Sequence, residues 1–419
     1  MTQHDEPVVR PAPDDRPATR AAVPRLPTQR TCPFDPPEEY QRIRAEAPVS
    51  RLRFPSGDLG WLVTGYGPVR TLLADPRVSS RRTRGSHPIR RLPPEAEKLL
   101  RTQPGDFITA DPPEHSRYRR LLTGQFTLRR MNALAGHIEE IVAEHLAAMA
   151  ELTPPVDLVR TFALPVPALV MCELLGVPFA DRELFSQRAQ AMISSEGEVA
   201  GLLRAREEML GYMHDLVRAK RRNPGPDMLS GLIGRSTPEG PLTDEELVNI
   251  GNLLLIAGFE TTANMLALGT LALVQHPDQF AALRDDPGLA ENAVEELLRY
   301  LSIPQHGVLR TATEDIEIGG ERIGAGEPIV AHVPAANRDP AQFTRPEELD
   351  VARPSAAHLA FGHGLHQCLG QQLARVEMRV AFRALVERFP ALRLAVPLDQ
   401  VRMRTDSFIY GVHELPVTW

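Results

Sequence analysis

The sequence feature that most constrains the fold is one long helical pattern, PLTDEELVNIGNLLLIAGFETTANMLALGTLALVQHP, at residues 241–277. Thr243 and Glu246 have the spacing of a capping box, so a helix is expected to begin here and to end at Pro277. At 1.5 Å per residue it is roughly 50 Å long, enough to cross a whole domain. Because it is apolar on most faces, it must lie in the interior, and the rest of the chain must fold around it.

Helical periodicity dominates the remaining middle of the chain, and strand patterns are short. Apolar residues recur every three or four positions at 130–152, at 290–301 and after residue 370. Strand-like alternation is confined to 59–65, 316–333, 392–396 and 414–419, and the second of these contains Gly-Gly and Gly-Ala-Gly, which predict hairpin turns. The sequence therefore predicts a mainly α domain with small β-sheets.

No repeat and no composition shift divides the chain after its first 30 residues. Residues 1–30 are rich in proline and mixed charge, so they are expected to form a disordered leader. Residues 31–419 are expected to form a single folded domain.

Charge and cysteine content exclude several classes of protein. A net charge of −7 argues against general nucleic-acid binding. Three cysteines without regular spacing give neither a disulfide framework nor a zinc site. The longest apolar runs, such as LLLIAG, are shorter than a bilayer span. We expect a soluble, cytoplasmic protein with no membrane partner.

One of the three cysteines lies in FGHGLHQCLG, residues 361–370, directly before an amphipathic helix. The glycines permit tight turns and close approach of a bulky group. At a helix N-terminus, backbone N–H groups and the helix dipole stabilise a thiolate. The alternative is an inert cysteine in a structural turn.

This segment resembles the heme-binding loop of the cytochrome P-450 family, written F-x-x-G-x-[RH]-x-C-x-G. In that family the cysteine thiolate is the proximal ligand of the heme iron. By this resemblance Cys368 is the axial ligand of heme b and Phe361 packs near it. Gly370 gives the ring room, and His366 lies near a heme propionate.

Further segments match the same family in its order. DPPEHSRYRRLL (111–122) places His115 and Arg119 on one helix face, which suits two propionates, although an exposed basic helix is the alternative. Arg310 occupies the position of another propionate-binding arginine. EELLR (295–299) resembles the family's E-x-x-R, so Glu296 and Arg299 are expected to form a buried structural group with Arg353.

AGFETT (257–262) lies midway along the long helix. A buried Glu260 is costly unless it has a role or a partner. An ordinary helix kink at Gly258 is the alternative reading. The resemblance makes Thr261 and Glu260 catalytic, an alcohol and an acid that handle the protons needed for O–O cleavage.

The resemblance covers about residues 32–419 and implies a monooxygenase that inserts one oxygen atom of O2, by hydroxylation or epoxidation, into a hydrophobic small molecule. The cysteine loop and the closing YGVHELPVTW look most like actinobacterial enzymes that tailor polyketides and macrolides. Relatives that oxidise steroids, vitamin D-like compounds or xenobiotics are an alternative. So are peroxygenation, oxidative coupling and a non-enzymatic heme sensor; the Glu260–Thr261 pair disfavours peroxide dependence, because peroxide users need no proton relay.

Electrons are expected from a ferredoxin and its NAD(P)H-dependent reductase, and the enzyme is expected to be a monomer. The arginines that could steer an acidic ferredoxin are Arg119, Arg120, Arg375 and Arg379. Pocket walls are expected from the regions 80–106, 175–200, 302–309 and 407–409 and from the long helix, where small side chains would leave space above the iron. The individual pocket residues predicted are Leu254, Ala257, Gly258, Val308, Phe408 and Ile409.

Overall fold

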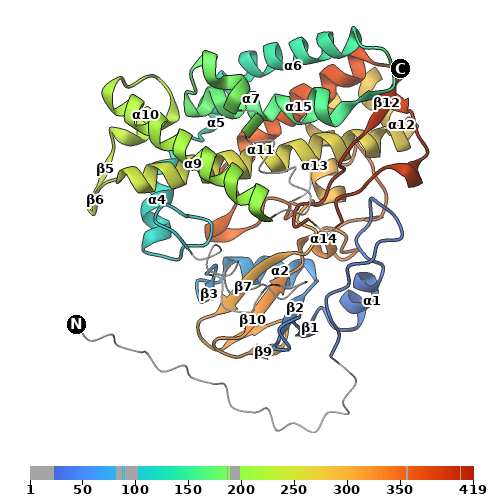
Figure 1. Cartoon of the computed structure of the whole chain (residues 1–419). Helices are drawn as coiled ribbons and strands as arrows, with labels where there is room; N and C mark the ends of the chain where they lie inside the picture. Colours follow the sequence, from blue (N-terminus) through green and yellow to red (C-terminus); the bar gives the residue numbers. More distant parts are fainter. Residues whose placement is uncertain are drawn as a thin grey trace.

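The computed structural model describes residues 23–81, 87, 89, 102–185, 187–188, 199–354, 357–405 and 407–419. Figure 1 shows a broad helical layer above a smaller sheet layer. The helices are α1 (Glu39–Glu46), α2 (Tyr66–Ala74), α4 (Glu114–Thr123), α5 (Leu128–Ala133), α6 (Ala135–Ala150), α7 (Pro165–Leu175), α9 (Val199–Arg222), α10 (Met228–Ile233), α11 (Asp244–Gln275), α12 (Pro277–Asp285), α13 (Ala290–Leu301), α14 (Val333–Ala336) and α15 (Gln371–Arg388). This confirms the prediction of a mainly α fold with small sheets.

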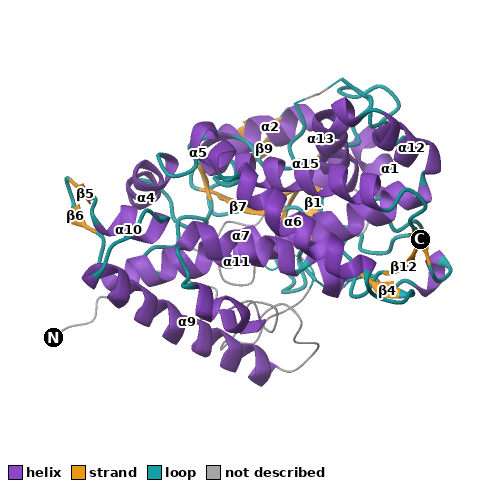
Figure 2. Cartoon of the chain, turned by 90° about the horizontal axis from the view of Figure 1, so that it is seen from above, coloured by secondary structure: helices purple, strands orange, loops and turns teal. Residues whose placement is uncertain are grey.

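The long predicted helix is α11, and it runs through the middle of the helical layer (Figure 2). Its capping box is present: the Glu246 N–H donates to Thr243 Oγ1 at 3.1 Å, and the Thr243 N–H donates to Glu246 Oε2 at 2.8 Å. Among the described helices α11 alone is long and apolar enough to cross a membrane, but most of it is buried in the protein. It is the core helix.

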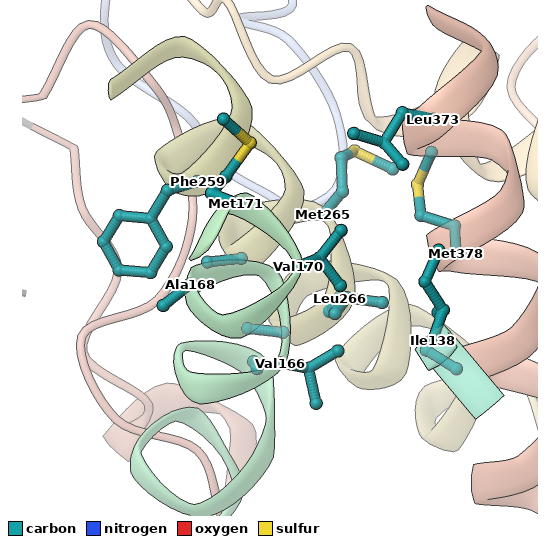
Figure 3. Packing of buried hydrophobic residues seen from close by; sticks show 14 of the residues in the cluster. Ile138, Val166, Ala168, Val170, Met171, Phe259, Met265, Leu266, Leu373 and Met378 are labelled. Atoms are coloured by element: carbon teal, nitrogen blue, oxygen red, sulfur yellow. The ribbon is translucent and has the colours of Figure 1, made fainter. Parts of the chain in front are cut away.

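Two glycines let neighbouring helices approach α11 closely. A Cβ on Gly258 would lie 2.7 Å from Met171 Sδ of α7, and one on Gly269 would lie 2.5 Å from Phe382 Cζ of α15. Figure 3 shows Met171 beside Phe259 of α11 in this core. The helix continues through Gly258, and the contact with Met171 gives this glycine a packing role.

The main sheet has the strand order β1-β2-β10-β7-β3, with β10 parallel to β2 and the other neighbours antiparallel. The predicted strand region 316–333 divides: β8 and β9 form a hairpin at the Gly-Gly turn, whereas β10 joins the main sheet. The strands are β1 (Val49–Arg53), β2 (Leu59–Val63), β3 (Val78–Ser79), β4 (Val156–Asp157), β5 (Ser236–Thr237), β6 (Gly240–Pro241), β7 (Val308–Ala312), β8 (Ile316–Ile318), β9 (Glu321–Ile323), β10 (Pro328–Ala331), β11 (Arg393–Leu394) and β12 (Pro416–Thr418).

Two predicted boundaries differ from the structure. The single helix expected at 130–152 is two helices, α5 and α6, which meet at Leu134. The predicted leader extends too far, because residues 24–30 pack on the domain: Leu26 is buried beside Tyr40, and the Pro27 carbonyl accepts a hydrogen bond from the Tyr40 hydroxyl at 3.0 Å. The disorder expected for residues 1–22 lies outside the described residues.

Candidate functional site

The cysteine loop is a compact turn that ends at the start of α15. Gly362 and Gly364 have φ of +71° and +72°, a conformation that favours glycine. A Cβ on Gly364 would also lie 2.5 Å from the Leu73 carbonyl oxygen, so a side chain would not fit there. The Cys368 N–H donates to the Phe361 carbonyl at 2.8 Å and closes the loop. The glycines thus hold the cysteine in a fixed position before the helix.

Cys368 lies where several groups favour its thiolate. Burial raises the pKa of Cys368, while the backbone N–H groups of Gly370 and Gln371 and the positive charges of Arg119 and Arg375 lower it. Gly370 is the N-cap of α15, and no atom lies within 4 Å of the place where its Cβ would stand. A flat group can therefore approach the backbone on this side.

Phe361 packs beside the loop under a fixed arginine. The guanidinium carbon of Arg375 lies 4.5 Å from the centre of the Phe361 ring. Arg375 also donates to both carboxylate oxygens of Glu295, at 2.6 and 3.0 Å, and His358 Nε2 lies 3.1 Å from the same carboxylate. This network holds Phe361 and the loop against α13.

The structure brings four predicted anchoring residues towards the loop from three elements. His115 and Arg119 come from α4, Arg310 comes from β7, and His366 precedes the cysteine. The rings of His115 and His366 are 4.2 Å apart between centroids. Both ring nitrogens of His115 are buried without a hydrogen-bond partner, and Arg119 makes no ion pair with any described residue. These groups form a basic cluster.

Burial and mutual repulsion set the charges of this cluster. Burial, with the positive charge of Arg119, lowers the pKa of His115 to about 4. Burial is the main cause that lowers the pKa of His366 to about 3, and the nearby His115, Arg310 and Arg119 lower it further by charge repulsion. Burial lowers the pKa of Arg310 to about 10, and the carboxylate of Asp111 opposes this only in part. The cluster therefore has unsatisfied polar groups and positive charge that a ligand with carboxylates would satisfy.

Glu260 and Thr261 lie together on a partly exposed stretch of α11. The Thr261 hydroxyl donates to the Ala257 carbonyl at 2.6 Å, so its oxygen keeps accepting capacity. Glu260 has a partner that the sequence did not suggest: Arg404 Nη2 lies 3.1 Å from Glu260 Oε1. Burial raises the pKa of Glu260, and Arg404 lowers it.

The predicted pocket segments from β7 and the C-terminal loop lie side by side. Pro304 and Ile409 form an antiparallel β-bridge, and the Gln305 N–H donates to the Phe408 carbonyl at 3.3 Å. Val308 follows on the same strand segment and is half-buried. Much of the expected walls at 80–106 and 175–200 lies outside the described residues.

The pocket residues predicted on α11 differ in their surroundings. Leu254 is buried in the main hydrophobic core, whereas Ala257 is half-buried one turn before Thr261. The direction of the absent side chain of Gly258 points at Met171 of α7. Its small size therefore serves helix packing, and its place in the pocket stays a prediction.

Glu296, Arg299 and Arg353 form a buried ion-pair group. Arg299 donates to both oxygens of Glu296 at 2.8 Å, and Arg353 Nε lies 3.0 Å from each of them. Further arginine N–H groups donate to backbone carbonyls of the segment 344–348. The group links α13 to the segment 344–348, and none of its three residues belongs to the cysteine loop at 361–370.

Two residues that the sequence analysis did not single out belong to this region. Arg404 lies in an irregular loop two positions after Arg402, and no local pattern distinguishes the two arginines. His306 lies within the predicted pocket region 302–309; its Nε2 is buried without a partner among the described residues, and its ring centroid is 6.5 Å from that of Phe408. Burial, with Arg30 and His87, lowers the pKa of His306 to about 4.

The arginines expected to steer an acidic partner are mostly engaged within the protein. Arg379 pairs with Glu291 at 2.7 Å, and Arg120 pairs with Glu239 at 3.3 Å. Arg375 is held by Glu295 as described above. Only Arg119 of the four has no carboxylate partner among the described residues, so the surface offers less free positive charge than the sequence suggested.

Known proteins resemble this chain over almost all of its length. A family model described as Cytochrome P450 matches residues 288–416. Cytochrome P450 105C1 of a Streptomyces species is 49% identical over 401 residues, which cover 96% of this chain and 100% of the relative. Pentalenic acid synthase of Streptomyces avermitilis is 45% identical over 406 residues, covering 96% and 99%. These matches define a heme-thiolate enzyme.

A solved structure leads to the same class. The crystal structure of CYP105P1 in complex with filipin I is 47% identical, covers 95% of this chain and 99% of its own, and superposes with a TM-score of 0.88. The chain belongs to the cytochrome P450 family. It is therefore a monooxygenase of the soluble actinobacterial type, with a cysteine-ligated heme as its cofactor.

The residues present fit heme. The orphaned nitrogens of His115 and the excess charge of Arg119 and Arg310 match a pair of propionates. The open space at Gly370 matches the edge of a flat ring, and the N–H groups facing Cys368 match a thiolate ligand. When bound, heme supplies oxygen activation, and the thiolate favours O–O cleavage.

Proposed function

We propose that the enzyme inserts one oxygen atom of O2 into a hydrophobic secondary metabolite, with Cys368 as the thiolate ligand of its heme. The position of Cys368 carries this proposal, since two backbone N–H groups at the start of α15 face its sulfur. Cys172 is a poor candidate because it is fully buried within α7 as part of the main hydrophobic core. In this proposal His115, Arg119, Arg310 and His366 hold the propionates.

Thr261 and Glu260 are proposed to handle protons. The Thr261 oxygen can accept a hydrogen bond from a proton-carrying water, because its own proton is used by Ala257. Glu260 is the adjacent acid on the same helix, and its partly exposed side chain can exchange a proton with solvent.

The substrate class rests on the relatives and on the composition of the pocket walls. One relative is described as pentalenic acid synthase, and the structure of another was solved in complex with filipin I. Both descriptions agree with a secondary metabolite as the substrate of this enzyme. Phe408, Ile409, Val308 and Ala257 supply an apolar lining. His306 supplies one polar group, and we assign it a hydrogen bond to a substrate oxygen.

Electrons are proposed to come from a ferredoxin that docks beside the cysteine loop. A surface depression of about 580 Å³ is lined there by Arg119, Arg120, Thr123 and the exposed Leu365, among other residues. The exposed side chains of Leu365 and Arg120 suit contact with a small acidic protein, in which a carboxylate would compete with Glu239 for Arg120. We further propose a monomeric cytoplasmic enzyme whose catalytic domain includes Leu26 and Pro27.

The ligand assignment is tested by the reduced carbon monoxide spectrum of purified protein. The wild type is expected to show the red-shifted thiolate band, and Cys368→Ala is expected to lose it. Cys32→Ala is the matched control, because Cys32 is half-buried and distant in sequence. A wild-type spectrum without this band, or its survival in Cys368→Ala, would contradict the assignment. A metabolite screen by substrate-induced spin shift, followed by product analysis, then identifies the substrate.

The docking surface is tested by charge reversal. Arg120→Glu is expected to weaken reduction by an acidic ferredoxin several-fold at low ionic strength and to leave the carbon monoxide spectrum unchanged. Arg284→Glu, at an exposed arginine on α12, is the control. Equal rates in the two variants at low salt would refute the docking site.

A further inference from the structure

The ion pair between Arg404 and Glu260 joins the C-terminal loop to the core helix. Arg404 Nη2 lies 3.1 Å from Glu260 Oε1, and Nη1 lies 3.4 Å from Asn264 Oδ1, one turn further along α11. The side chains of Arg404 and Glu260 are only 12% and 20% exposed. The arginine thus spans two positions on one face of α11 and is largely removed from water.

The loop that carries Arg404 has a fixed position on α11. The Arg404 N–H donates to the Gly411 carbonyl at 2.9 Å, and Met403 bridges Val412. A Cβ on Gly411 would lie 1.8 Å from Asn264 Oδ1, so only glycine allows the loop to seat so closely on the helix. Because the backbone is fixed in this way, the guanidinium is presented to Glu260 by the fold.

Gln305 fixes the same loop from its other side. Its side-chain amide donates to the carbonyls of Arg404 and Thr405, each at 3.2 Å, and also to the carbonyl of Ser407. The clamped segment continues into Phe408 and Ile409 of the proposed pocket wall. The ion pair and the pocket wall therefore lie on either side of the carbonyls that Gln305 holds.

The charge balance at Glu260 depends on this arginine. Burial of the carboxyl group favours its neutral form, and Arg404 is the one charged group among the described residues that acts against burial. A proton carrier works best when its proton affinity lies near the working pH, since it must both take up and release a proton. Without Arg404, Glu260 would hold its proton too tightly.

We propose that Arg404 is a positioning residue for Glu260: it holds the carboxyl group in a fixed orientation next to Thr261 and keeps it ionised until it takes up a proton from solvent. The inference rests on the proposed role of Glu260 in proton delivery. Arg404 itself does not transfer a proton, because a guanidinium stays charged in proteins. It acts through the carboxylate.

The test measures the proton affinity of Glu260 directly. The infrared band of its protonated carboxyl group, identified by its loss in Glu260→Gln, is followed against pH in the purified heme-containing enzyme. In Arg404→Gln the proton affinity of Glu260 is expected to rise at least tenfold. In Arg404→Lys, which keeps the charge, it is expected to stay within about threefold of the wild type. Arg402→Gln, at an exposed arginine of the same loop, is the matched control and is expected to change nothing.

The second readout is the pH profile of product formation. In Arg404→Gln the limb that reports Glu260 is expected to move to higher pH, and less product is expected per electron at neutral pH. If Arg404→Gln behaves as Arg402→Gln in both readouts, or if Arg404→Lys behaves as Arg404→Gln, the inference is wrong. A wild-type enzyme without the thiolate spectrum, or one whose product yield is unchanged in Glu260→Gln, would instead overturn the proposed function.

Discussion

Replacing Arg299 with methionine is expected to cost about 3–5 kcal/mol of unfolding free energy, the range found when one partner of a buried ion pair is removed. The Arg299 side chain is 2% exposed and uses all of its nitrogens. It donates to both oxygens of Glu296 at 2.8 Å and to the carbonyls of Asn337, Pro346 and Glu348 at 3.0, 2.8 and 3.1 Å. Methionine keeps most of the volume, so the loss comes from unpaired polar groups and not from a cavity.

In Arg299→Met, Glu296 keeps its hydrogen bonds from Arg353 and from the Asp350 N–H, and these reduce the expected loss of unfolding free energy. Arg353 Nε still lies 3.0 Å from both oxygens, and the Asp350 N–H still donates at 3.0 Å. Because one of two arginines remains, the lower half of the range is expected, about 3–4 kcal/mol. A domain with about 5–15 kcal/mol of total stability would lose a large share of it.

The assay is guanidinium unfolding followed by circular dichroism, together with heme content after purification. Arg383→Met is the control, because the Arg383–Glu387 pair is exposed and should contribute less than about 0.5 kcal/mol. A loss below about 1 kcal/mol for Arg299→Met, or a loss equal to that of the control, would refute the reasoning about burial.

Three further predictions concern other parts of the molecule. Thr261→Ala is expected to keep the heme spectrum but to divert electrons to peroxide several-fold, measured as peroxide per NAD(P)H consumed; unchanged coupling would contradict the role of Thr261. Burial would raise the pKa of Glu295, but hydrogen bonds from His358 and Arg375 lower it to about 2. This lowered pKa contributes about 3 kcal/mol to the free energy of unfolding at pH values above the ordinary carboxyl pKa near 4. The contribution is lost as the pH falls towards 2, so the free energy of unfolding should decrease less steeply with falling pH in Glu295→Gln than in the wild type. His306→Phe is expected to weaken binding of a hydroxylated substrate about fivefold in a spin-shift titration while leaving its deoxy analogue unaffected, since one hydrogen bond is worth about 1 kcal/mol.

Local signals in the sequence predicted the helices best. The capping box of Thr243 and Glu246 placed the start of α11, and amphipathic periodicity placed α13 at Ala290–Leu301, where the structure has it. Periodicity did not find the break at Leu134, because apolar residues continue in phase across two short helices. Composition alone likewise assigned residues 24–30 to a leader, because contacts such as that of Leu26 with the domain leave no local pattern.

The sequence by itself determined the chemistry and the core of this protein. FGHGLHQCLG resembles the heme-binding loop of the cytochrome P-450 family, and the apolar length of residues 244–275 predicts one buried helix at the centre of the domain. Both are short-range patterns, which follow from backbone geometry within a few residues.

Only the tertiary structure decided which charges neutralise one another. Arg404 meets Glu260 across 144 positions of the chain, and Arg375 is withdrawn from the surface by Glu295 across 80 positions. The glycine at 258 lets Met171 of α7 approach the core helix closely. The physical reason is that an ion pair or a close helix contact depends on the relative placement of two backbones, which packing of the whole core sets and which no local spacing contains.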